Sequence, residues 1–401
     1  MGPGGQVGCG PSRDLFSGPS LLIVSGPTIL LSAGEPSGDL YGAEVARALR
    51  ARWPGAKLFG LGGPRMAAAG VELLADPEKL AVMGFIEVVG QLPFFWRLLR
   101  KLGSELSARS VDLVLPIDYP GFNLRLAEVA KGRGIPVLYY IAPQVWAWNR
   151  KRIYKFAAFT DRVALILPFE EDLFRRAGVD ATFVGHPLLD LPSPGSRRAL
   201  CRELNLEEAR PLLALFPGSR AQEVKRHLAI FIETAIRLQA YHPALQPVVA
   251  VSETVPARLY RGIPFPRTKN SRDLLWHAHA ALVKSGTTTL EAALCATPMA
   301  IAYRTHPLTY LVAKRLVDVD HIGLVNLVAG QRLVPEFIQS EATPAALYSA
   351  LLPLIRSDSK ARSEMVEGLR DVRNTLEGGA DNAVNVADRV VGLAAELLSS
   401  K

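Results

Sequence analysis

The sequence predicts an α/β protein made of two doubly wound domains, each built on a parallel sheet. The 401 residues exceed what one hydrophobic core normally holds, and 49% of them are hydrophobic against 21% charged. Short apolar runs alternate with amphipathic helical patterns, and the alternation restarts after the Pro- and Gly-rich segment 187–197. We therefore predict domains at 29–190 and 191–401, with a ligand site in the cleft between them.

The N-terminal segment 1–28 is rich in Gly, Pro and Ser and lacks the basic start of a signal peptide. We predict that it is a disordered tail. Ser25, Gly26 and Pro27 interrupt the apolar residues at this end, and no run in the chain is long enough to cross a bilayer. Any membrane contact is therefore expected to be peripheral.

Composition narrows the classes of ligand. The 46 basic and 38 acidic residues give a formal charge of +8, which favours phosphorylated small molecules or an acidic membrane surface. Nucleic acid is not expected as a partner, because no arginine-rich run with interleaved aromatics occurs. The three cysteines have neither pairing nor metal-ligand spacing, so we expect a reducing cytosol and no structural zinc.

The predicted strands are continuous apolar runs, as expected for a parallel sheet that helices cover on both faces. In the first half they lie at Ile29–Ala33, Lys57–Leu61, Asp112–Ile117, Pro136–Ile141, Arg162–Leu167 and Thr182–Val184. In the second half they lie at Leu212–Phe216, Pro247–Ser252, Ala280–Lys284 and Met299–Tyr303. Helical patterns separate them, for example at Leu40–Arg52 and Asn123–Lys131, and from about Thr343 the pattern is helical only.

Two segments of the first domain follow strands and carry candidate functional residues. The Gly-rich segment 32–39 (SAGEPSGD) precedes a helix, whose N-terminus could bind an anion or a sugar hydroxyl. An ordinary tight turn with Asp39 as the helix N-cap fits equally well. Asp118 follows the Asp112–Ile117 strand, where a carboxylate could remove a proton from an acceptor hydroxyl. From the residues alone, we favour a turn role for Asp118, capping the helix near Asn123.

The most unusual stretch is 139–152 (YYIAPQVWAWNRKR), in which Trp146 and Trp148 precede three consecutive basic residues. Aromatic faces and cations together suit a sugar ring and a phosphate. Packing of the tryptophans between the domains is the alternative, and we favour the functional interpretation.

Two turns of the second domain predict a nucleotide site. Pro217–Arg220 follows a strand and offers an arginine that can bind a diphosphate bidentately. Segment 285–291 (SGTTTLE) also follows a strand, and its hydroxyls suit phosphate oxygens while Glu291 suits ribose hydroxyls. Each turn alone could be structural, but both in one domain indicate a nucleotide diphosphate site.

Other suggestive residues are interpreted as structural. Asp318-Val319-Asp320 has metal-binding spacing but closes a helical pattern, so we expect no metal there. His277 and His279 are interpreted as packing or surface residues. For His186, a turn role and a place in the cleft both fit.

Segment 82–102 combines Phe94, Phe95 and Trp96 with the cations Arg97, Arg100 and Lys101. An interfacial segment that meets lipid and an amphipathic helix packed on the sheet explain this pattern equally well.

Together the segments resemble one family, the lipid-A-disaccharide synthases. The matching stretches occur in the expected order between about Leu31 and Gly330. They are SAGEPSGDLYGA, GLGGPRM, LAVMGFIEV, IDYPGFN, YYIAPQVWAWNRKR, LPFE, FVGHPL, LFPGSRAQEV, SGTTTLEA and HIGLVNLVAG.

The resemblance implies a GT-B fold: two Rossmann-like domains that face a central cleft, with UDP in the C-terminal domain and a helical C-terminus. It implies inverting transfer of 2,3-diacylglucosamine from UDP to 2,3-diacylglucosamine 1-phosphate, with a β-1,6 bond and no metal or cofactor. By resemblance Asp118 is the base, which reverses the preference stated above. The expected substrate-binding residues are Glu35, Ser37, Gly38, Gln144, Trp148, Ser219, Arg220, Gly286, Thr287, Thr288, Glu291 and Asn326.

Acylated substrates imply a peripheral protein on the cytoplasmic face of the inner membrane, with Phe94–Lys101 as a docking surface. A homo-oligomer is left open. The rival interpretations are another UDP-sugar enzyme of this fold, such as a hexosamine epimerase or a peptidoglycan glycosyltransferase, and a non-catalytic nucleotide-sugar-binding regulator. VMGFIEV and QVWAWNRKR count against the first rival, and Asp118, Arg220 and Glu291 count against the second.

Overall fold

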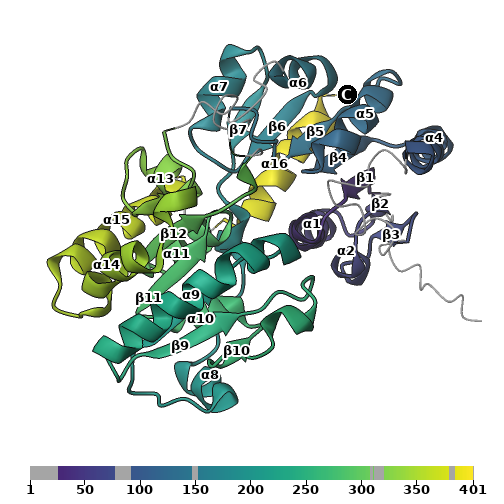
Figure 1. The fold of residues 1–401 in the computed structure, drawn as a ribbon. Helices are drawn as coiled ribbons and strands as arrows, with labels where there is room; N and C mark the ends of the chain where they lie inside the picture. The colour runs from purple at the N-terminus through teal and green to yellow at the C-terminus, as the bar shows by residue number, and fades with distance from the viewer. Residues whose placement is uncertain are drawn as a thin grey trace, which may run out of the picture.

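The computed structural model describes residues 26–76, 92–146, 152–307, 310, 320–378 and 384–400. Two parallel sheets stand one after the other along the chain, and helices cover both (Figure 1). The predicted fold class is therefore confirmed. The predicted tail 1–28 lies outside the described residues up to residue 25, and at its end Thr28 already opens the first strand.

The first sheet has the strand order β3-β2-β1-β4-β5-β6-β7. Its strands are β1 Thr28–Ala33, β2 Lys57–Leu61, β3 Glu72–Leu73, β4 Leu113–Ile117, β5 Leu138–Tyr140, β6 Arg162–Leu165 and β7 Ala181–Phe183. The strand order reverses between β1 and β4, which pair in parallel. In such sheets ligands bind beyond the carboxyl ends of the strands at this reversal.

The second sheet has the order β10-β9-β8-β11-β12-β13. Its strands are β8 Leu212–Phe216, β9 Gln246–Ala250, β10 Arg267–Thr268, β11 Ala280–Lys284, β12 Met299–Tyr303 and β13 Glu336–Ile338. Here the order reverses between β8 and β11. The two turns predicted to hold a nucleotide therefore leave the sheet side by side.

The helices alternate with these strands. Those of the first half are α1 Pro36–Arg52, α2 Pro64–Ala68, α4 Leu92–Ala108, α5 Pro120–Lys131, α6 Ile153–Phe159 and α7 Glu170–Arg176, followed by the 3₁₀ turn η3 Pro187–Asp190. Those of the second half are α8 Arg197–Leu204, α9 Ala221–Tyr241, α10 Ser271–His277, α11 Thr288–Leu294, α13 Leu324–Ala329, α14 Pro344–Ile355, α15 Lys360–Glu377 and α16 Val386–Ser399, with 3₁₀ turns η4 Ala257–Tyr260 and η5 Gln339–Glu341. No helix of the described residues is long and apolar enough to span a membrane.

All ten predicted strands exist, and their ends differ by two residues at most. The missed strands β3, β10 and β13 have only two or three residues each, too few to show a period. Helices α1 and α5 begin earlier than predicted, each with a proline in its first position. Proline suits that position because its ring presets φ and the missing N–H has no helical acceptor.

The last helix departs from the expected division of the chain. Segment 191–401 was predicted to form the second domain together with the terminal helices, yet α16 lies beside α1 and the first sheet (Figure 1). The reason is its apolar face, because Val390, Val391 and Ala394 complete the core built around β1 and α1.

The chain therefore crosses between the domains twice, and the two crossings are bonded together. The His186 N–H donates to the Leu376 carbonyl at 3.2 Å. The Asp190 carboxylate accepts the N–H groups of Val386 and Ala387, each at 3.0 Å, at the N-terminus of α16. These bonds make the crossing a double-stranded connection.

Candidate functional site

The Gly-rich turn after β1 places Glu35 at the N-cap of α1, and Glu35 and Ser37 are exposed whereas Gly38 is buried. Asp39 is not the N-cap, as the turn interpretation required. It lies one turn into α1, and its carboxylate accepts the N–H groups of Gly63, Arg65 and Met66 at 2.8, 3.1 and 2.9 Å. Asp39 thus caps the neighbouring helix α2.

Asp118 stands directly after β4 in a left-handed conformation, with φ of 49°, and Tyr119 follows with φ of 50°. Such conformations are strained for residues with a Cβ and persist only when the surroundings hold them. Here the Asp118 carbonyl accepts hydrogen bonds from Asn123 Nδ2 at 2.8 Å and from the Tyr139 hydroxyl at 2.7 Å. Asn123 is itself fully buried and accepts the Ser32 hydroxyl at 2.6 Å, which ties the turn to β1.

The pKa of the Asp118 carboxyl lies closer to neutral pH than that of an ordinary aspartate. Burial raises its pKa to about 6, the charge of Glu35 acts in the same direction, and a backbone hydrogen bond from Tyr119 opposes both. The two loops are in close contact, since a Cβ at Gly34 would lie 2.4 Å from the Tyr119 ring. A general base with such a pKa can be ionised at neutral pH and still accept a proton readily.

A cavity of about 650 Å³ lies at the carboxyl edge of the second sheet. It gathers the predicted residues of both turns. Those on its lining are Ser219, Arg220, Gly286, Thr287, Thr288 and Glu291. The volume lies within the range of ordinary small-molecule sites, and the two predicted turns line one cavity.

Glu223 and Lys284, which the sequence interpretation did not include, organise this cavity. Glu223 accepts the N–H groups of Ser219 and Arg220 at 3.0 and 3.3 Å and pairs with Lys284 at 2.9 Å. Burial works against the charge, but Lys284 and the two N–H groups hold the pKa of Glu223 below its ordinary value. The signal for Glu223 was its place three residues after the N-cap Arg220, the spacing of a capping box.

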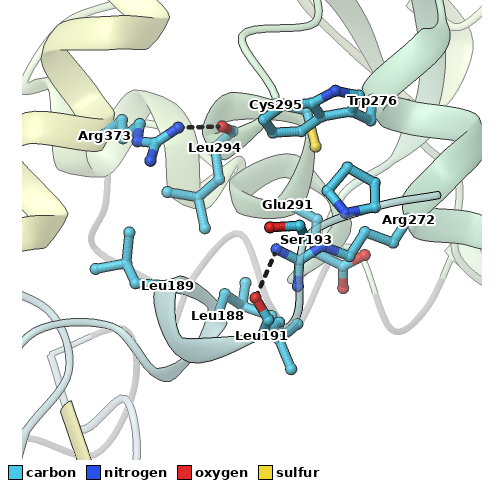
Figure 2. Close-up of a pocket in the computed structure, with 11 residues that line it drawn as sticks. Leu188, Leu189, Leu191, Ser193, Arg272, Trp276, Glu291, Leu294, Cys295 and Arg373 are labelled. Atoms are coloured by element: carbon cyan, nitrogen blue, oxygen red, sulfur yellow. Dashed lines mark hydrogen bonds between the residues drawn. The ribbon is translucent and has the colours of Figure 1, made fainter. Parts of the chain in front are cut away.

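Glu291 lines this cavity and also a smaller pocket of about 180 Å³ against the interdomain linker, which Figure 2 shows. Burial raises the pKa of Glu291, and the charge of Arg272 opposes it. Arg272 Nη2 donates to the Leu191 carbonyl at 3.1 Å, so α10 is joined to the linker beside Glu291 (Figure 2).

Tyr41 is influenced by the charges of both Asp118 and Glu291. This α1 residue is buried, and its pKa is raised by burial first and then by the charges of Glu291 and Asp118. The candidate base of the first domain and the acidic residue of the second therefore lie within electrostatic reach of the same side chain.

Of the residues predicted to bind substrate, those of the Gly-rich turn after β1 do not line this cavity, and neither do Asn326 and Gln144. Asn326 is fully buried, and its amide is bonded to both backbone groups of Val334 and to Glu336, each at 2.8 Å. Direct contact with a ligand would require loss of these bonds. Gln144 is exposed in the loop after β5 and is not part of the lining, and Trp148 lies outside the described residues.

Trp146 is a packing residue rather than a free aromatic face, which corrects the functional interpretation for this tryptophan. It is buried, and its Nε1–H donates to Glu170 Oε1 at 2.9 Å. The centroid of its ring lies 5.2 Å from that of the Phe169 ring, in an edge-to-face arrangement. The apolar surface of the indole is therefore used inside the protein.

Helix α4 uses most of its apolar face internally, because Leu98, Leu102 and Leu106 pack in the first-domain core. Trp96 is the exception, with 55% of its surface exposed and Arg125 stacked over its ring at 5.5 Å. Much of the predicted interfacial segment 82–102, up to residue 91, lies outside the described residues, as does Asp318 of the acidic triplet.

The chain is similar to known proteins along most of its length. The family model described as lipid-A-disaccharide synthetase matches residues 29–391. Proteins named lipid-A-disaccharide synthase from Trichlorobacter lovleyi and Myxococcus xanthus are 43% and 40% identical over 355 and 369 residues. These matches cover 86% and 90% of this chain and 92% and 96% of the relatives.

Solved structures agree on the fold. A calicheamicin glycosyltransferase superposes with a TM-score of 0.58 at 17% identity, covering 93% of this chain and 98% of its own. A putative UDP-N-acetylglucosamine 2-epimerase from Listeria monocytogenes gives 0.61 at 10% identity, with 94% and 97% covered. At such identities the likeness concerns the GT-B fold alone.

Proposed function

Because the chain belongs to the lipid-A-disaccharide synthase family, a family of glycosyltransferases with a UDP-sugar donor and a lipid acceptor, we propose the following reaction. The enzyme transfers 2,3-diacylglucosamine from its UDP derivative to 2,3-diacylglucosamine 1-phosphate. The products are the β-1,6-linked disaccharide 1-phosphate and UDP. Inversion at the anomeric carbon follows from a single displacement by the acceptor hydroxyl.

Asp118 is the general base of this proposal, and its environment is the observation that carries it. A single displacement needs a group that takes the proton of the acceptor hydroxyl as the bond to carbon forms. Asp118 combines a strained, doubly clamped backbone with a pKa of about 6 at the strand-order reversal of the first sheet. Such strain is typical of functional sites.

UDP occupies the cavity of the second domain in this proposal. Arg220 binds the diphosphate, the segment Gly286–Thr288 contributes hydroxyl and backbone groups, and Glu291 accepts the ribose hydroxyls. Lys284 and Glu223 hold the Ser219–Arg220 turn in place. Departure of UDP leaves negative charge on the diphosphate, which cations at this position stabilise.

Three of the remaining predicted residues, Glu35, Ser37 and Gln144, are assigned to the sugar side of the cleft. Glu35 and Ser37 are exposed on the turn beside Asp118, and Gln144 is exposed after β5. We assign the acceptor to this edge. We assign no direct ligand contact to Asn326, because its amide is already satisfied inside the protein.

The acyl chains of both substrates lead us to propose peripheral binding to the cytoplasmic face of the inner membrane. The exposed Trp96 beside the exposed cations Arg97 and Arg100 supports this proposal. Because the leucine face of α4 packs in the core, the docking surface is limited to the N-terminal turns of this helix.

The test is incubation of the purified enzyme with UDP-2,3-diacylglucosamine and the acylated sugar 1-phosphate. The expected result is a disaccharide lipid and UDP in equal amounts. Asp118→Asn should lower kcat by about 10²–10⁴-fold, whereas Asp371→Asn, at an exposed position on α15, should not. Release of UDP without a disaccharide, or full activity of Asp118→Asn, would contradict the proposal.

A further inference from the structure

One residue of the first domain takes part in the cavity of the second. Of the described residues that line this cavity, Arg65 of α2 alone comes from the first domain. Helices α1 and α2 lie on the side of the first domain that faces the second (Figure 1). Arg65 therefore reaches the candidate nucleotide site from across the cleft.

The backbone of Arg65 is held rigidly. Its N–H donates to the Asp39 carboxylate, which is buried and also binds the N–H groups of Gly63 and Met66. Pro64 starts the helix, and Met66 on the other side of Arg65 is fully buried. A Cβ at Gly63 would lie 2.5 Å from Asp39 Oδ2, so only glycine allows this close capping contact. The motif GGPR thus presents an exposed arginine side chain from a rigidly held backbone.

The charges on the lining divide into paired and unpaired groups. Lys269 pairs with Glu253 at 3.3 Å, and Lys284 pairs with Glu223 at 2.9 Å. Within the described part of the chain, neither Arg65 nor Arg220 pairs with a carboxylate, although both line the cavity. The cavity therefore offers one unpaired guanidinium from each domain.

We propose that Arg65 binds the diphosphate of the donor from the first domain, opposite Arg220. The inference rests on the proposed function, because it needs a nucleotide diphosphate in the cavity. A guanidinium binds phosphate oxygens through two parallel N–H groups, and two of them can hold the four free oxygens of a diphosphate ester from opposite sides. The same contact draws the two domains toward each other around the nucleotide and stabilises the negative charge that develops on UDP as its bond to the sugar breaks.

The experiment measures binding of UDP and of uridine to the whole protein with Arg65→Met, Arg65→Lys and Arg220→Met. The matched control is Arg47→Met, at an exposed arginine of α1 that pairs with Glu44. Arg65→Met should weaken UDP binding by about tenfold or more and leave the weak binding of uridine, followed by NMR titration, unchanged. Arg65→Lys should recover part of the loss, and Arg47→Met should show none.

The variants distinguish the phosphates of the donor from the phosphate of the acceptor. They also test the role of Arg65 separately from the proposed function. Unchanged UDP affinity in Arg65→Met overturns the inference. If the KM for the acylated sugar 1-phosphate rises instead, Arg65 binds the phosphate of the acceptor. Loss of UDP affinity in Arg220→Met but not in Arg65→Met leaves the proposed function intact and refutes this inference alone. Absence of UDP binding by the unaltered protein contradicts the proposed function itself.

Discussion

Glu170 gives a quantitative prediction about stability, because the hydrogen bonds to this buried carboxyl come from uncharged donors, the Trp146 indole and the Leu167 backbone. Only 1% of its surface is exposed, Oε1 accepts the Trp146 indole N–H, and Oε2 has no hydrogen-bond partner among the described residues. Burial raises its pKa from 4.5 to about 8, and the hydrogen bonds from Trp146 and the backbone only partly oppose this. The folded protein therefore holds the proton more tightly than the unfolded chain does.

The sign of the effect follows from this order of pKa values. The contribution of Glu170 to the free energy of unfolding is most favourable below pH 4.5 and is lost progressively as the pH rises through about 8. At about 1.36 kcal/mol per pKa unit, the full loss is on the order of 5 kcal/mol. Glu170→Gln keeps an acceptor for Trp146 but cannot ionise, so the variant should exceed the stability of the unaltered protein by about 1 kcal/mol at pH 5 and by about 4–5 kcal/mol at pH 8.5.

The assay is denaturant unfolding at both pH values, followed by tryptophan fluorescence so that the surroundings of Trp146 are reported. Asp172→Asn, at an exposed position on the same helix, is the matched control and should show no comparable difference between the two pH values. A Glu170→Gln variant that is less stable by the same amount at both pH values would contradict a raised pKa of Glu170. That result would mean that the folded protein keeps Glu170 ionised throughout.

The remaining predictions concern the loops around Asp118 and helix α4. Glu35→Gln removes a charge that raises the pKa of Asp118, so the acid limb of the kcat profile near pH 6 should move to lower pH, and an unmoved limb would argue against Asp118 as the base. Tyr139→Phe removes one of the two bonds to the Asp118 carbonyl and should cost about 0.5–1.5 kcal/mol in unfolding free energy together with part of kcat. Equal kcat would show that Asn123 alone holds the turn. Trp96→Ala should reduce sedimentation of the protein with anionic lipid vesicles while activity on detergent-dispersed substrate persists, and undiminished sedimentation would place the docking surface elsewhere.

The long strands and the meeting of the turns after them could be predicted from the sequence for a physical reason. Strands such as Leu212–Phe216 and Ala280–Lys284 are covered on both faces, so their buried residues are apolar and form a continuous run, which in the second strand ends at Lys284. Because parallel strands end at one edge of their sheet, the turns after them were expected to meet, and Arg220 and Glu291 do line one cavity.

The contributions across domains could not be predicted in this way. Arg65 lines the cavity only because α2 faces the second domain, and no periodicity encodes how two domains face each other. Lys284 is the last residue of β11, and nothing in the sequence distinguishes it before its pairing with Glu223 is seen. For Trp146 the sequence prediction was wrong. The unusual composition of its segment favoured contact with a ligand, whereas the indole packs inside the protein and donates to Glu170.

The return of α16 to the first domain has a consequence for how the protein is made. The carboxylate of Asp190 can bind its N–H donors only after α16 has been synthesised, because Val386 lies 196 residues further along the chain. At ribosomal speeds that interval is roughly 10–40 s, during which the groove over α1 that Val390 and Ala394 later fill stays uncovered. The first domain is synthesised first but completed last, so its apolar groove is where a chaperone would act on the growing chain.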